Sequence, residues 1–260
     1  MDVTSLGFRT DLMVLRLGGS EVVDAGDCIV VRTPANPTFW WGNFLLVPEP
    51  FGPGDGKRWV DRFRREFPDA SHRAIGVDTV DGAAGLPAEL EAAGVESDVS
   101  VVLTAPSLVE PPESPFEIRM LTTPDDWQQA YSLRSAVYGE PESSEAAMFP
   151  ARQIDAARTL TEGGHAVWIG AIFDGQLVAS LGIVSDGRGL ARFQSVETHP
   201  DFRRRGIARR LLYDAATYAA NEFAATTTVI VADPDDHAIA LYRSVGFADT
   251  ERQVRLQAAR

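Results

Sequence analysis

The chain has 260 residues, 45% of them hydrophobic and 23% charged, which is typical of a globular protein and excludes a disordered chain. Its net charge of −13 argues against nonspecific nucleic-acid binding, and no apolar run reaches the roughly 20 residues of a membrane span. A single cysteine, Cys28, and a start without a basic segment followed by an apolar stretch predict a cytoplasmic protein.

The negative charge is distributed unevenly along the chain. Residues 1–115 carry 18 acidic and 9 basic side chains, a net charge of −9, which leaves 19 acidic and 15 basic side chains, a net charge of −4, for residues 116–260. Because the less negative region repels an anion least, we expect any anionic ligand to bind in the C-terminal half.

The N-terminal half shows the weaker pattern of secondary structure. Apolar periodicity predicts strands at 28–32, 43–47, 74–77 and 99–103, and helices at 57–67 and 87–93. A segment with repeated prolines, residues 110–115, follows the last of these strands. Because proline denies hydrogen bonds to helix and strand alike, we place an N-terminal domain at 1–110, a linker at 111–115 and a second domain at 116–260.

The C-terminal half has clearer signals. A strand at 116–121 is followed by a helix that starts with a capping threonine, Thr123, and a proline, Pro124. The remaining expected elements are a helix at 151–160, strands at 166–173, 176–184 and 190–198, a helix from 207, a strand at 227–232, a helix at 236–244 and a strand at 248–256. This order indicates an α/β fold.

The strongest motif, HPDFRRRGIA at residues 199–208, follows a predicted strand and opens an amphipathic helix. A turn before a helix directs main-chain N–H groups and the positive end of the helix dipole to one point, which is how proteins bind phosphate. Glycine and small residues keep bulk away from that point. The motif predicts a phosphate site formed by Arg203, Arg204, Arg205, Gly206, Ile207 and Ala208, although an exposed basic helix start would have the same letters.

The chain here resembles the GNAT superfamily of N-acetyltransferases. That family's pattern of Gln or Arg, two residues, Gly, one residue, then Gly or Ala is matched by Arg203, Gly206 and Ala208. A second block, AIALYRSVGF at 238–247, is similar to the family's alanine-rich helix with Leu-Tyr and a closing Gly-Phe. The resemblance covers residues 116–256 and implies a mixed, largely antiparallel sheet flanked by helices.

The order of elements in the N-terminal half is similar to the second half of this pattern. The nearest local match aligns Leu90 with Tyr242 and Gly94 with Gly246. We therefore expect a second, smaller and degenerate GNAT-like domain, with the alternative that any α/β unit produces such an order by chance.

The resemblance implies roles for particular residues. Main-chain groups of Val196, Glu197 and Thr198 would contact the acetyl-pantetheine arm of acetyl-CoA in the gap beside a splayed strand, and the loop from Arg203 to Ala208 would bind the pyrophosphate. Tyr242 matches the family's frequent general acid, with packing of an aromatic ring as the alternative.

The general base is left open by the sequence. Some relatives carry a catalytic glutamate at positions that are Arg192 and Ile230 here, so neither position can supply a glutamate as the general base. Glu197 and His199 are the nearest titratable candidates, and water or the amine itself are alternatives. Asp235, where relatives often have asparagine, lies near the cofactor or caps the following helix. The histidines lack metal-ligand spacing, so we expect no metal.

The sequence thus predicts direct transfer of an acetyl group from acetyl-CoA to a primary amine, without a covalent intermediate because no suitably placed cysteine is present. A noncatalytic acyl-CoA-binding sensor or scaffold is the main alternative, and a tandem repeat without cofactor is the second. The acceptor amine is not defined, and a homodimer is compatible with the sequence without being required by it.

Overall fold

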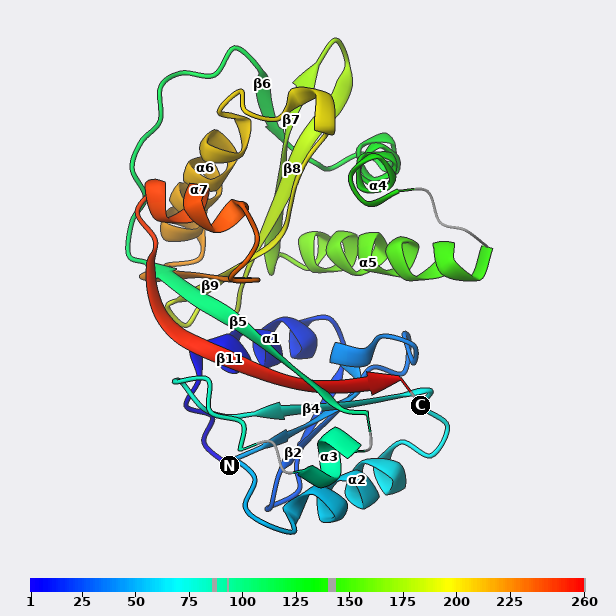
Figure 1. The fold of residues 1–260 in the computed structure, drawn as a ribbon. Helices are drawn as coiled ribbons and strands as arrows, with labels where there is room; N and C mark the ends of the chain where they lie inside the picture. Colours follow the sequence, from blue (N-terminus) through cyan, green and yellow to red (C-terminus); the bar gives the residue numbers. More distant parts are fainter. Residues whose placement is uncertain (86–87, 93, 140–143, 260) are drawn as a thin grey trace. The chain divides into compact units, whose positions relative to one another are not determined.

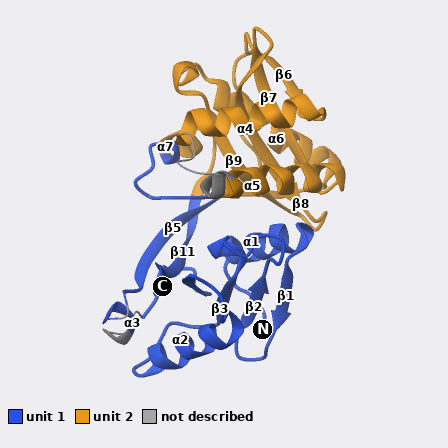
Figure 2. Ribbon diagram, turned by 90° about the vertical axis from the view of Figure 1, so that its right-hand side faces the viewer, with its two compact units in different colours: residues 1–103, 231–239, 249–260 blue, residues 104–230, 240–248 orange. Residues whose placement is uncertain are grey.

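The computed structural model describes residues 1–85, 88–92, 94–139 and 144–259, which form two compact units (Figures 1 and 2). Unit 1 consists of Met1–Leu103, Val231–Ile239 and Asp249–Arg260, and unit 2 consists of Thr104–Ile230 and Ala240–Ala248. The compact units thus divide the chain at other points than the proline-rich linker. The division at 111–115 stays a prediction about where independently folding domains begin and end.

Unit 1 is built on a mixed sheet in the strand order β1-β2-β3-β4-β11-β5. Its strands are β1 (Glu21–Asp24), β2 (Ile29–Arg32), β3 (Phe44–Val47), β4 (His72–Val77), β5 (Glu96–Ala105) and β11 (Ala248–Ala259). The pair β3/β4 is parallel, whereas β1/β2, β2/β3 and β4/β11 are antiparallel. Its helices are α1 (Leu6–Leu17), α2 (Asp55–Glu66), α3 (Ala88–Ala92) and a 3-10 turn at Trp40–Gly42.

Helix α1 lies on one side of this sheet, and α2 and α3 lie on the other (Figure 1). Close approach of α1 depends on Gly76 of β4, because a Cβ added there would lie 2.6 Å from the ring of Phe8. The helix begins at the capping residue Ser5, and its first free amide, that of Leu6, donates to Glu251 of β11 at 2.8 Å. The terminal strand therefore stabilises the first helix of the chain.

Unit 2 has the strand order β10-β9-β8-β7-β6. Its strands are β6 (Glu117–Met120), β7 (Ala166–Phe173), β8 (Gln176–Ser185), β9 (Leu190–Thr198) and β10 (Thr227–Ala232). The pair β9/β10 is parallel, and the other neighbours are antiparallel. Helices α4 (Pro124–Tyr138) and α5 (Ser144–Glu162) cover one face, and α6 (Ile207–Glu222) covers the other, with the short α7 (Ala238–Ser244) on the same side as α6 (Figure 1).

The two halves of the chain repeat one order of elements. Along the chain, β1-β2-β3-α2-β4-α3-β5 is followed later by β7-β8-β9-α6-β10-α7-β11. In each copy an antiparallel pair precedes a parallel pair whose strands are joined by a helix, α2 between β3 and β4 and α6 between β9 and β10. The sequence-based interpretation of the N-terminal half as a repeat of the C-terminal pattern therefore agrees with the observed order.

Most predicted elements lie within a few residues of the observed ones, and the exceptions have physical reasons. Helix α1 and strand β1 were not predicted. Three of the four residues of β1 are exposed, so the strand has no apolar pattern, whereas α1 has a local signal, the capping Ser5, that the prediction did not use. Helix α5 begins at Ser144 instead of 151 and continues through Pro150, although proline usually marks a helix start. Of the predicted helix 87–93, Pro87 and Ala93 lie outside the described residues. Among the described helices, none is long and apolar enough to cross a membrane.

Candidate active site

The loop between β9 and α6 has the backbone of an anion site. After a 3-10 turn at Pro200–Phe202, Arg203 is extended, Arg204 has φ +62° and Gly206, the N-cap of α6, has φ +78°. Residues of alternating φ sign direct successive N–H groups into one concavity. Gly206, the N-cap, makes no side-chain hydrogen bond to the first turn of α6. The positive, N-terminal end of this 16-residue helix therefore has no side-chain cap. This arrangement suits a phosphate group.

The arginines of this loop have different surroundings. Arg203 donates from Nε to the Thr198 carbonyl at 3.3 Å, and Arg205 donates to the Asp201 carbonyl at 3.0 Å while its guanidinium lies 4.9 Å from the centre of the Phe202 ring. Within the described part of the chain, the exposed Arg204 makes no side-chain hydrogen bond. Two arginines thus stabilise the loop, and Arg204 remains available to a ligand.

Aromatic side chains hold the start of the loop in place. The Phe202 ring lies 6.3 Å from that of Phe116, 5.4 Å from that of Phe173 and 5.9 Å from the His199 ring. His199 also accepts a hydrogen bond at Nδ1 from the Asp201 amide at 3.3 Å. His199, a candidate base in the sequence, therefore serves here as a cap of the turn.

Strand β9 carries a bulge beside this loop. Ser180 of β8 pairs with Glu197 and Gly182 pairs with Gln194, so Ser195 and Val196 lie opposite the single residue between them on β8. Ser195 has φ +50°, which costs a non-glycine residue roughly 1 kcal/mol or more. On its other edge, β9 pairs with β10 only as far as Val229↔Arg192 in the described part of the chain. Main-chain groups at Val196 and Thr198 are thus next to an unpaired edge.

Glu197 is buried, with 3% of its surface exposed, and it faces the guanidinium of Arg134 from α4. Nε of Arg134 donates to Oε1 at 2.9 Å, and Nη2 lies 2.7 Å from the same oxygen. Oε2 takes part in neither contact. Burial raises the pKa of Glu197 above its usual value, although the charge and hydrogen bonds of Arg134 act to lower it. With Oε1 engaged by Arg134, Oε2 is the oxygen of Glu197 that could accept a proton.

Tyr242 of α7 is buried, with 6% exposed, and belongs to the same unit as the loop and the bulge. Its ring lies 6.2 Å from that of Phe247, which lies 5.9 Å from that of Phe193 on β9. Arg209 in the first turn of α6 donates to Ser244 Oγ of α7 at 3.0 Å. The structure thus connects the helix that carries Tyr242 to both β9 and the start of α6.

Helix α7 is capped by Asp236 and not by Asp235, which the sequence suggested. Asp236 Oδ1 accepts from the Ala238 amide at the helix start, whereas the Asp235 amide donates to Asp233 Oδ1, both at 2.8 Å. The carboxylate two positions before the first helical amide is therefore the cap. In the described residues, no group of three metal-ligating side chains lies close enough to bind an ion.

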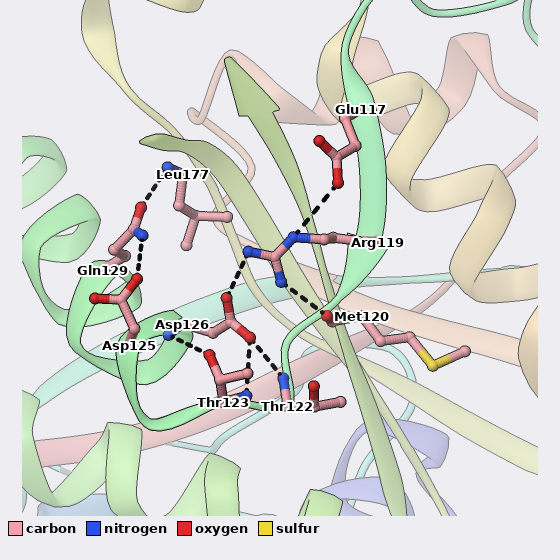
Figure 3. Close-up of polar contacts among 9 residues, drawn as sticks. All are labelled: Glu117, Arg119, Met120, Thr122, Thr123, Asp125, Asp126, Gln129 and Leu177. Carbon is pink, nitrogen blue, oxygen red and sulfur yellow. Dashed lines mark hydrogen bonds and ion pairs between the residues drawn. The ribbon is translucent and has the colours of Figure 1, made fainter. Parts of the chain in front are cut away.

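Helix α4, which supplies Arg134, is anchored at its start by a buried carboxylate (Figure 3). Asp126 is 2% exposed, accepts from the amides of Thr122 and Thr123 at 2.9 Å, and lies 2.6 Å from Nη2 of Arg119. The Thr123 hydroxyl in turn accepts from the Asp126 amide, which completes a capping box. The Arg119 guanidinium, with the amides of Thr123 and Thr122, holds the pKa of Asp126 well below its usual range although burial raises it.

Asp126→Asn is expected to destabilise the protein by about 2 kcal/mol at pH 7, because it removes a charged partner from buried hydrogen bonds. Since the folded-state pKa is lowered, the carboxylate stabilises the fold above the unfolded-state pKa of about 3.9, and this contribution is lost as the pH falls through the folded-state value. Urea unfolding at pH 7 and pH 3 measures both effects, and the difference between the proteins should shrink at pH 3.

Asp125→Asn is the matched control, because Asp125 lies in the same turn but is exposed and bonded to Gln129 (Figure 3). We expect its effect to stay within about 0.5 kcal/mol. Equal losses in the two variants at both pH values would contradict the role given to the buried carboxylate.

Arg134 was missed by the sequence reasoning, although a signal for it exists. Trp127, Ala130 and Arg134 are spaced as one helix face, and the first two are buried. An arginine on the apolar face of a helix requires a buried acidic partner, because an unpaired charge is not stable there. The partner, Glu197, lies 63 positions along the chain, which no local pattern could indicate.

Comparisons with known proteins agree with this geometry. Residues 126–247 match the sequence model of the acetyltransferase (GNAT) family. A GCN5-related N-acetyltransferase from Kribbella flavida is similar in structure, with a TM-score of 0.69 and 19% identity over 98% of this chain and 96% of that one. A functionally unknown conserved protein from Staphylococcus epidermidis has a TM-score of 0.72 at 12% identity, covering 93% and 94% of the two chains.

A tandem GNAT protein from the clavulanic acid biosynthesis pathway is also similar, with a TM-score of 0.56 and 16% identity over 94% of this chain and 87% of that one. A comparison with curated proteins found no match to this sequence. The family match confirms the resemblance inferred from the loop and the Leu-Tyr block, and the structures confirm the fold class. Residues 126–247 of this chain are an acetyltransferase domain of the GNAT family, within a GNAT-like fold.

Proposed function

We propose that this protein transfers an acetyl group from acetyl-CoA directly to a primary amine. The match of residues 126–247 to an acetyltransferase family makes acyl transfer the expected reaction. The observation that carries the proposal further is that one unit contains the positive-φ loop before α6, the bulged edge of β9 and the buried Tyr242 of α7. In this proposal the loop from Arg203 to Ala208 binds the pyrophosphate.

The pantetheine arm is proposed to run along the edge of β9, with main-chain groups of Val196, Glu197 and Thr198 as its partners. A strand edge without a neighbouring strand offers N–H and C=O groups that an amide-containing ligand can pair with. Amides at a bulge point away from the regular ladder, so they can also bind the thioester carbonyl oxygen where negative charge develops.

A primary amine that arrives protonated must lose two protons before it becomes an amide, and the departing thiolate must gain one. The amine loses a proton, for which we propose Oε2 of Glu197 as acceptor, directly or through water. Its nitrogen then attacks the thioester carbon, a C–N bond forms and the C–S bond breaks. The Tyr242 hydroxyl gives its proton to the departing thiolate and regains one from the nitrogen, directly or through water, so the products are an amide and free CoA.

Direct attack is supported by the state of the chain's single cysteine. Cys28 is fully buried in unit 1, and burial raises the pKa of its thiol to about 11. A buried thiol with such a pKa is not a nucleophile at neutral pH. A reduced, buried cysteine also supports the proposal that the protein acts in the cytoplasm.

A panel of primary amines, including polyamines, amino sugars and peptide N-termini, tests this function when free CoA is detected with a thiol reagent. We expect at least one amine to raise CoA release well above the hydrolysis of acetyl-CoA alone. Acetyl-CoA binding without release in the presence of any amine would instead support a noncatalytic sensor, which the engagement of Glu197 by Arg134 favours as the second candidate.

A further inference from the structure

One guanidinium connects three elements of unit 2. Arg134 of α4 donates from Nη2 to Ser195 Oγ at 2.7 Å and from Nε to Glu197 Oε1 at 2.9 Å, both on β9. Its Nη1 donates to Oε1 of Gln153 on α5. The residue is 8% exposed. All of its donors therefore point into the unit. One of its three partners, Ser195, belongs to the bulge, and another, Glu197, directly follows it.

We propose that Arg134 is a positioning residue of the acyl-transfer site, which holds Ser195 and Glu197 together and thereby fixes the main-chain amides of the β9 bulge. The proposal rests on the function proposed above, since the bulge matters only if it faces the acyl group. Arg134 itself is not assigned a contact with either substrate.

The backbone at the bulge needs such a restraint. Ser195 is held at φ +50°, a conformation that costs a non-glycine residue roughly 1 kcal/mol or more, so surrounding contacts must stabilise it. The Ser195 side chain bonds to Arg134, and the next inward-facing side chain along the strand, Glu197, bonds to the same group. Losing these bonds would allow the bulge to relax or to shift along β8.

A planar fork is suited to this task. Arginine places several N–H donors in fixed directions, whereas lysine has one terminal nitrogen on a flexible stem. A lysine at 134 would keep the positive charge opposite Glu197 but could not hold both β9 side chains in the same geometry. Glutamine would lose the charge as well and leave the buried Glu197 without its partner.

The test uses the full chain, acetyl-CoA and the fastest amine of the panel. We expect Arg134→Gln to lower kcat at least about ten-fold, because displacing a catalytic group by about 1 Å can lower the rate about a hundred-fold. The KM for acetyl-CoA should change less than about three-fold, because the phosphate loop is untouched. Arg134→Lys should have an intermediate kcat. Arg158→Gln is the control, since Arg158 of α5 forms an exposed pair with Glu162.

A kcat for Arg134→Gln within two-fold of the control, or an increase in KM alone, would overturn the proposal. If Arg134→Gln does not fold, Ser195→Ala decides the question: it removes one bond and leaves the charge pair intact, and we expect a several-fold loss of kcat, whereas wild-type kcat refutes the role. If the wild-type protein turns over no amine, the proposed function itself is refuted. If the wild type is active and the variants are fully active, only the positioning role of Arg134 is refuted.

Discussion

Replacing Tyr242 with phenylalanine is expected to lower kcat about 100-fold, the lower end of the range for losing a general acid or base. Phenylalanine keeps the ring that packs against Phe247, 6.2 Å away, and removes only the hydroxyl that would protonate the departing thiolate. Because the pyrophosphate loop is not altered, the Kd of acetyl-CoA should change less than about two-fold. Steady-state kinetics and calorimetric titration measure the two quantities separately.

Tyr218→Phe provides the control for this prediction. Tyr218 lies on α6, is half-buried and packs against Phe223 with ring centres 5.4 Å apart, so it resembles Tyr242 in chemistry but has no proposed role. Its kcat should equal that of the wild type. Similar kcat values for Tyr242→Phe and Tyr218→Phe would show that Tyr242 only packs, which is the alternative that the sequence left open.

Replacing Gly206 with valine is expected to weaken acetyl-CoA binding more than ten-fold. The residue has φ +78°, where a β-branched side chain is strained by roughly 1–2 kcal/mol, so the loop would leave the conformation that gathers its N–H groups. A Cβ at this position meets no atom within 4 Å, which means that the effect comes from the backbone and not from a clash. Calorimetric titration gives the affinity.

Gly54 offers an unusually close control, because it occupies the same place in the repeated order of unit 1. It is the N-cap of α2 with φ +85°, and an added Cβ there also meets nothing within 4 Å. Gly54→Val should therefore cost a similar amount of stability without changing the affinity for acetyl-CoA. Equal loss of affinity in both variants would mean that strain, and not the position of the loop, is responsible.

The two loops differ in the chemistry of their side chains. The loop of unit 2 contains Arg203 and Arg204, whereas the loop between β3 and α2 of unit 1 contains Glu49 and three prolines. Asp55 places its carboxylate at the start of α2, where it accepts from the Gly52 amide at 2.8 Å. A carboxylate at that position takes up an amide and repels phosphate. Unit 1 thus retains the fold of the repeat with a loop unsuited to pyrophosphate.

Much of the fold could be predicted from local sequence. Strand β7 of unit 2 is a continuous apolar run, and Thr123 with Pro124 marks the start of α4, where the structure has a complete capping box. Local patterns failed where an element depends on distant partners. Strand β11 pairs with β4, a partner far away in the chain, so the residues around β11 do not show its place in the sheet.

In the candidate site, too, local sequence predicted some features, and features that depend on distant contacts were missed. The loop could be found because glycine and arginine occur at a fixed spacing before an apolar helix, and positive φ at Arg204 and Gly206 gives it the expected form. The bulge at Ser195 and its connection to Arg134 could not be found, because a bulge depends on the register with β8 and a buried charge pair joins residues 63 positions apart. Residue roles in catalysis stay proposals.

The central claim is that a chain with two repeated units binds acyl-CoA through only one of them. Calorimetric titration of the full chain with acetyl-CoA tests it most directly, since the stoichiometry counts the sites. We predict one site per chain, abolished or weakened more than ten-fold by Gly206→Val and unchanged in Gly54→Val. Two sites per chain would contradict the assignment to the loop before α6, and no binding at all would contradict the proposed use of acetyl-CoA.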